Sequence, residues 1–260
     1  HKTGAASQPL FREANLSKLK LRKADLRQVD FTKTDLTSAN LCGSRLSEAC
    51  FEDARLPVSR LIGVSLDKAN LTRADLNKAC LAKSSLVDSI LNDAQLNDAN
   101  LKCANLSGAE MKKARLDYAN LKRANLSDAQ LSGAVMKGAN LHSVSLQRTV
   151  LNNADLRETD LGSAIIEVDI NQADFVNLRG AKIDESTIMP KKLRDVLEIQ
   201  GTPSIKKKPN ISDEKRERSS EDSLLDLLVS ESADLEVKRD QRYKDVDLSM
   251  SDLDDVYLSG

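Results

Sequence analysis

Residues 104–126 read ANLSGAEMKKARLDYANLKRANL, and a large apolar residue recurs at every fifth position of this stretch. The same spacing extends from Phe11 to Ile166, where 26 of 32 such positions are Leu and the others are Phe, Met or Ile. The residue two positions before each of these centres is usually small, with 20 Ala among the 31 positions from Ala14 to Ala164. A period of five fits neither an α-helix nor a β-strand. The pattern therefore predicts a repeat architecture.

A chain that turns a corner every five residues sends one large and one small side chain inward from each side, and four such sides close one coil of about 20 residues. Phe11, Phe31 and Phe51 fall at the same position of three successive coils and are expected to stack. Successive coils would be about 4.8 Å apart, so residues at equivalent positions would meet like cross-strand neighbours. Three columns of outward residues support this register: Glu13, Lys33, Asp53, Arg73, Asp93 and Lys113; Glu48, Lys68 and Asp88; Asn100, Asn120 and Asn140. The first two alternate in charge, so Asp53 should contact both Lys33 and Arg73, and the third predicts an amide ladder.

Units such as Ala24-Asp25-Leu26, Ala69-Asn70-Leu71 and Ala124-Asn125-Leu126 follow the motif A(D/N)LXX. Over residues 11–189 the chain resembles the pentapeptide-repeat family. The resemblance implies an all-β solenoid, a right-handed quadrilateral β-helix of about eight to nine coils. Eight coils at about 4.8 Å each would make a rod about 38 Å long.

The sequence divides into five segments: an N-terminal extension (1–10), the β-helix (11–189), a short helix that caps it (190–200), a charged linker (201–222) and an acidic tail (223–260). The five-residue register breaks near Asp169, so the last coil is expected to be irregular, with Ala181 and Ile183, then Ser186 and Ile188, pointing inward. Pro190 suits the first turn of the capping helix.

The acidic tail combines charge with short apolar clusters. Residues 221–260 contain 12 Asp and Glu against 4 Lys and Arg, a balance of −8. Such segments usually order only when a partner buries their apolar side chains. The predicted anchors are Leu224, Leu225, Leu227, Leu228, Val229, Val246, Leu248 and Leu253.

The sequence offers no catalytic constellation. His142 follows a centre and should point to solvent, and Asp25, Asp30 and Asp35 should lie on different sides of the coil. The four Cys occupy outward positions that do not suit disulfide geometry, which predicts free thiols and a reducing compartment. No metal-ligand spacing or phosphate-binding loop is present. We therefore expect no enzyme activity, cofactor, metal or small-molecule substrate. With no apolar run near the roughly 20 residues of a membrane span, we also expect no insertion into a membrane.

One side of the predicted coil is strongly basic. It has the centres Leu21, Leu41, Leu61, Leu81, Leu101, Leu121, Leu141 and Leu161. Its outward cations are Lys20, Arg22, Lys23, Arg60, Lys83, Lys102, Lys122 and Arg123, and its one acid is Asp160. The other three sides are nearly balanced, at 5 cations against 6 acids, 6 against 6 and 4 against 6. One side in four must be the most basic by chance, but such a surface also suits an acidic protein, an anionic membrane or nucleic acid.

These features predict a non-enzymatic scaffold or linker subunit that joins protein subunits in a large assembly, through the basic side and the acidic tail. The family resemblance suggests a chloroplast photosynthetic complex, on the stromal side of the thylakoid, with the cytoplasm as the alternative. The best-known family activity, inhibition or protection of a DNA topoisomerase by acidic rods that mimic DNA, is the second hypothesis. It fits less well because residues 1–190 carry 26 Lys and Arg against 23 Asp and Glu. We expect no direct contact with nucleic acid, whereas a peripheral position at a membrane is compatible with the basic side.

Overall fold

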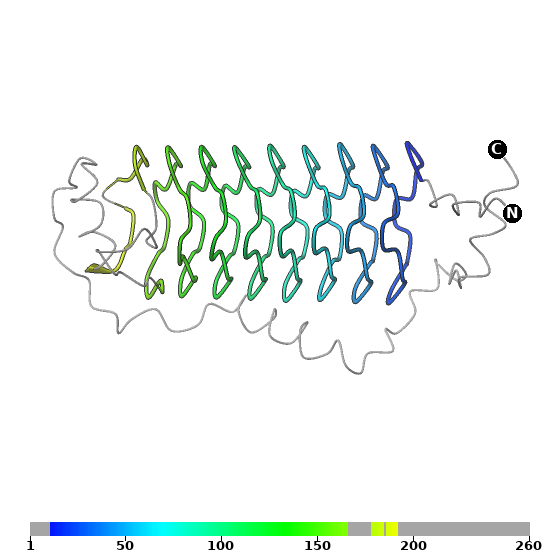
Figure 1. The fold of residues 1–260 in the computed structure, drawn as a ribbon, viewed down its shortest axis with the longest axis horizontal. Helices are drawn as coiled ribbons and strands as arrows, with labels where there is room; N and C mark the ends of the chain where they lie inside the picture. The colour runs from blue at the N-terminus through cyan, green and yellow to red at the C-terminus, as the bar shows by residue number, and fades with distance from the viewer. Residues whose placement is uncertain (1–10, 166–177, 185, 192–260) are drawn as a thin grey trace, which may run out of the picture. The chain divides into compact units, whose positions relative to one another are not determined.

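The computed structural model describes residues 11–165, 178–184 and 186–191. From Asn15 to Ile165 every fifth residue forms a parallel β-bridge, and each bridge joins residues 20 apart, such as Asn15 with Asp35 and Ser145 with Ile165. Residues 11–165 thus stack as four-sided coils around one axis (Figure 1). This confirms the predicted register of the coil. The predicted total of eight to nine coils takes in residues outside the described ranges.

A tight turn after each centre bends the chain. The third residue of each turn has a left-handed backbone at every fifth position from Glu13 to Ser163, as at Cys103 with φ of 58°. The next amide then bonds back to the carbonyl of the centre, as Ala104 N does to Leu101 O at 2.9 Å. Positive φ at the third residue with such a bond is typical of a type II turn. Each five-residue unit is therefore one turn and one bridge residue.

Hydrogen bonds between coils satisfy the backbone. Leu101 N donates to Asn120 O at 2.7 Å, Cys103 N donates to Lys122 O at 2.9 Å, and Asn105 N donates back to Ser84 O at 2.9 Å. These three hydrogen bonds recur in unit after unit. They pair the buried backbone N–H and C=O groups even though the described coils contain no extended strands. A solenoid of this type is stabilised mainly by contacts between neighbouring coils.

The core consists of the predicted ladders of large and small side chains. The Leu centres from Leu21 to Leu161 are buried, as are the small residues from Thr34 to Thr159. Phe11, Phe31 and Phe51 stack as expected, with ring centroids 5.4 and 4.8 Å apart. The inward assignment of both ladders is confirmed for residues 21–161.

Asn and Asp at the bridge positions stabilise the next turn. Asn100 Oδ1 accepts the amide of Lys102 at 3.1 Å, and Asp35 Oδ1 accepts that of Thr37 at 2.9 Å. This short-range bond explains the second letter of the repeat motif. Where the bridge residue is not Asn or Asp, a side chain of the preceding coil can accept the turn amide instead. For example, Arg115 precedes the turn of Asp117, and Asn97 Oδ1 accepts the amide of Asp117 at 3.1 Å.

Past Ile165 the register changes. Lys182 bridges Asp155 and Ile188 bridges Asp160, so the offsets are 27 (182 − 155) and 28 (188 − 160) instead of 20. Ala181 is buried and Ile183 packs on the core, as predicted. The prediction that Ser186 and Ile188 point inward is wrong, because the step lengthens to six residues: Met189 is buried, whereas Ile188 is 47% exposed.

Of the predicted capping helix (190–200), the structure describes only Pro190 and Lys191, which do not test it. The rest of that predicted helix, the N-terminal extension, the linker and the tail lie outside the described residues. In the ranges that the structure describes, no helix is long and apolar enough to cross a membrane.

Candidate protein-binding surface

Three outward positions of each unit form the surface of the coil: the bridge residue and the two residues after the centre. Parallel bridges stack Lys20, Asn40, Arg60 and Cys80 in one column of successive coils. The same register places Lys83, Cys103 and Arg123 in a second column, each with a left-handed turn backbone. We call the side built from these columns and from Arg22, Lys23, Lys102 and Lys122 the basic face.

The structure brings all eight predicted cations to the basic face. Lys102 and Lys122 are half-buried, and the other six are exposed: Lys20, Arg22, Lys23, Arg60, Lys83 and Arg123. None of these six forms an ion pair with another described residue. Among described residues, the basic face has one acid–base contact, His142 Nδ1 to Asp160 Oδ1 at 3.7 Å. The described residues therefore compensate little of the positive charge on the basic face.

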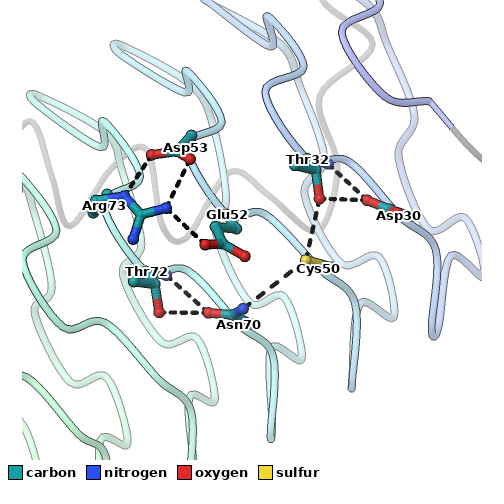
Figure 2. Close-up of polar contacts among 8 residues, drawn as sticks. All are labelled: Asp30, Thr32, Cys50, Glu52, Asp53, Asn70, Thr72 and Arg73. Carbon is teal, nitrogen blue, oxygen red and sulfur yellow. Dashed lines mark hydrogen bonds and ion pairs between the residues drawn. The ribbon is translucent and has the colours of Figure 1, made fainter.

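On the other three sides, several cations of the described chain bind nearby acids. Arg73 donates from Nε and Nη2 to the carboxylate of Asp53, at 2.7 and 2.8 Å, and from Nη2 to Glu52 at 2.6 Å (Figure 2). These bonds lower the pKa of Asp53 and raise that of Arg73. Arg157 similarly lowers the pKa of Asp155 through its side-chain hydrogen bonds. Because cations and acids are also nearly equal in number on these sides, each of them has little net charge.

The predicted column of alternating charges is confirmed only in part. Lys33 pairs with Glu13 at 3.7 Å and Arg73 pairs with Asp53. Lys33 forms no ion pair with Asp53, although its charge is a minor contribution to the lowered pKa of that carboxyl. Because the Arg73 guanidinium binds Asp53 through two nitrogens, the column resolves into pairs. Asn125 Nδ2 donates a hydrogen bond to Asn105 Oδ1 at 3.2 Å, whereas the predicted ladder residues Asn100, Asn120 and Asn140 are joined by backbone bridges.

Between the two ends of the basic face, the surface is low and largely uncharged. Cys42 and Ile62 are half-buried, Gly43 and Gly63 have no side chain, and Ala82 is buried. Arg60 is the one cation that this strip contributes. A smooth strip of this kind would let another chain lie close to the coil.

The four cysteines are free thiols, and Cys42, Cys80 and Cys103 belong to the basic face. Burial raises the pKa of the Cys80 thiol, so that side chain is a poor nucleophile at neutral pH.

Among the described residues, no three His, Cys, Asp or Glu side chains gather where a metal ion could bind. Asp25, Asp30 and Asp35 lie on different sides of the coil, as predicted; Asp30 and Asp35 each accept the amide two residues on, and Asp25 binds Arg27. The predicted tail anchors lie outside the described residues.

Two features escaped the sequence interpretation. The first is the turn-stabilising bond of bridge-position Asn and Asp, which the frequency of these residues before each centre could have indicated. The second is Val58, a β-branched residue with φ of 58°. Its position two residues after a centre, where Gly also occurs at Gly43 and Gly63, could have marked it as strained.

Comparison with known proteins agrees with this geometry. The family model for pentapeptide repeats matches the chain in eight copies, over residues 10–48, 49–88, 89–128 and 124–162. A search of curated protein sequences gave no match.

Solved structures of pentapeptide repeat proteins also align with the chain. HetL, involved in heterocyst differentiation regulation in the cyanobacterium Nostoc sp. strain PCC 7120, is 28% identical, with 72% of this chain and 94% of that chain covered and a TM-score of 0.30. QnrB1, a plasmid-mediated fluoroquinolone resistance protein, is 18% identical, with coverages of 75% and 96% and a TM-score of 0.40. A protein of the Arabidopsis thaliana thylakoid lumen is 26% identical, with coverages of 42% and 70% and a TM-score of 0.30.

The family model covers more than half of the 260 residues, and the bridges, turns and inward ladders repeat at the spacing the motif requires. The chain therefore belongs to the pentapeptide-repeat family.

Proposed function

We propose that the protein is a non-enzymatic scaffold that holds protein subunits together in a larger assembly. In this proposal the β-helix binds an acidic surface of one subunit through the basic face, and the acidic tail binds a second subunit through its apolar anchors. Two linked contacts of this kind raise the overall affinity by effective concentration, without any new interaction.

The observation that carries the proposal is the segregation of charge. Six exposed cations of the basic face have no ion pair with a described residue, while Arg73, Arg148 and Arg157 on other sides bind carboxylates. Like charges on adjacent coils repel each other, which costs stability unless a partner compensates them. An acidic protein surface supplies that compensation and makes association fast and dependent on salt.

The same charge argues against the DNA-mimic hypothesis, since a rod that replaces DNA would need a negative surface.

A stromal position beside the chloroplast thylakoid remains a prediction from the family resemblance. Microscopy of a full-length fluorescent fusion in plant cells would test it, and a cytoplasmic signal would contradict it.

Affinity purification from native extract, with a matched charge-reversed variant, tests the proposed role. The basic-face variant replaces Lys83, Lys102, Lys122 and Arg123 with Glu. The control variant makes the same change at four exposed lysines of other sides: Lys18, Lys68, Lys78 and Lys113. We expect the first to lose a protein that the wild type and the control both retain. Equal recovery of every copurifying protein by the two variants would refute the role of the basic face.

A further inference from the structure

We propose that, in the absence of a partner, the chain's own acidic segment 245–255 occupies the basic face. This inference rests on the proposed function, because it takes the basic face to be a binding surface. A partner would then have to displace the segment, so the tail would limit binding to subunits acidic enough to compete.

Charge complementarity supports this occupant. Segment 245–255 has the sequence DVDLSMSDLDD, with five Asp and no Lys or Arg. The cluster at 224–229 contains one Asp and is the weaker candidate. Unlike an unrelated acidic protein, the segment is present at a fixed ratio of one per basic face.

The charges of the basic face and those of segment 245–255 have similar spacing. Lys23 and Lys83 belong to one column of turn residues and are three coils apart, or about 14 Å at 4.8 Å per coil. The acids of the segment form two groups, which end at Asp247 and begin again at Asp252. Five residues of extended chain cover about 17 Å. Each acidic group can therefore lie over one cationic group, with the uncharged residues 248–251 over the smooth strip.

The segment can reach this position without strain. The described chain ends at Lys191, next to the last bridge at Ile188, and 53 residues (244 − 191) separate it from Asp245. The reach needed is modest for that length, because even the end-to-end distance expected for a random coil of 53 residues is about 40 Å. The basic face is about 38 Å long, so every coil is accessible. A tether of this kind gives an effective concentration on the order of millimolar or below, which makes even a weak contact populated.

Lysine acetylation of the purified full-length protein tests the inference. The rates at Lys20, Lys23 and Lys83 are measured by mass spectrometry, with Lys68, Lys78 and Lys113 as internal controls on other sides. The test variant replaces the five Asp of segment 245–255 with Asn. The control variant keeps all five and replaces Val246 and Leu248 with Ser.

We expect the basic-face lysines to react about threefold more slowly in the wild type than in the Asn variant, as an occupancy near two thirds requires. The control variant should behave like the wild type. In 1 M NaCl, where charges are screened beyond about 3 Å, the protection should disappear.

Equal rates in the wild type and the Asn variant would overturn the inference. Protection that increases with protein concentration would also overturn it, because the occupant would then be the tail of a second copy. Either result would leave the proposed function intact if the basic-face variant still lost its partner in the purification. Equal acetylation rates in the wild type and the Asn variant, together with equal partner recovery by the basic-face variant and its control, would refute both proposals.

Discussion

Arg73 binds the carboxylate of Asp53 through two nitrogens, at 2.7 and 2.8 Å, although the two residues belong to different coils. The pair lies in the column where parallel bridges place residues of adjacent coils side by side (Figure 2). It therefore reports the register of the coil directly, because a change of one residue in the repeat would move the two side chains apart. The same register assigns all eight predicted cations to the basic face.

The buried Leu ladder predicts a large loss of stability on truncation. Leu101 is fully buried, as are Leu81 and Leu121, the equivalent centres of the adjacent coils. Leu101→Ala should lower the free energy of unfolding by about 2–5 kcal/mol, through lost apolar contact and the cavity left behind. Chemical denaturation measures the change. The control Gln95→Ala, at an exposed position, should stay within about 0.5 kcal/mol of wild type. Similar losses in both variants would contradict the inward position of Leu101.

Ser59 is a buried defect in the ladder of small residues. Its Oγ has no hydrogen-bond partner within the described residues, although the side chain is 1% exposed. Ser59→Ala should stabilise the protein by about 1 kcal/mol, because burial of an unsatisfied hydroxyl is unfavourable. Thr149→Val is the matched comparison: Thr149 Oγ1 donates to Leu126 O at 2.8 Å, so that variant should lose about 1 kcal/mol. Thermal unfolding that showed the same sign for both would contradict this account.

Val58 is held in a backbone conformation that β-branched residues avoid. Its φ is 58°, and its side chain is 55% exposed, so little packing offsets the strain. Val58→Asn should raise the free energy of unfolding by about 1 kcal/mol, since Asn tolerates the left-handed region. Gly133→Ala is the reverse test, because Gly133 has φ of 70° and a Cβ there would meet Lys113 Cγ at an ordinary 3.6 Å. We expect a loss of about 1 kcal/mol for that change. A neutral result at both positions would show that these turns relax freely.

Asp155 makes stability depend on acid pH. Its hydrogen bonds with Arg157 lower its pKa in the folded state. The resulting stabilisation is complete above the unfolded-state pKa of about 3.9 and is lost as pH falls through the lower folded-state pKa. Asp155→Asn should therefore be less stable than wild type at pH 7, and the difference should shrink by pH 2.5. Asp98→Asn, at an exposed carboxylate without a described partner, should track the wild type at both pH values. A pH-independent deficit in Asp155→Asn would contradict the assigned ionic role.

The core could be predicted from sequence because inward positions are fixed by a strictly local period. Leu101, for example, is assigned by its neighbours five residues away alone. The partner of Lys33 could not be predicted, because a flexible side chain chooses among several carboxylates at similar distance. The six-residue step from Ile183 to Met189 was not predicted for a related reason: where the five-residue repeat is lost, the sequence alone does not distinguish the apolar residues Ile188 and Met189, of which Met189 is buried.

The repeat register places the eight cations on one side, but whether they bind another subunit has to be measured in the assembly. Crosslinking mass spectrometry of the native assembly, with a reagent that joins lysines to carboxylates, measures it most directly. We predict that Lys20, Lys23 and Lys83 crosslink to acidic residues of another subunit, while Lys68, Lys78 and Lys113 do not. Crosslinks to another subunit that involved only the second set would contradict the assignment of the basic face as the binding surface.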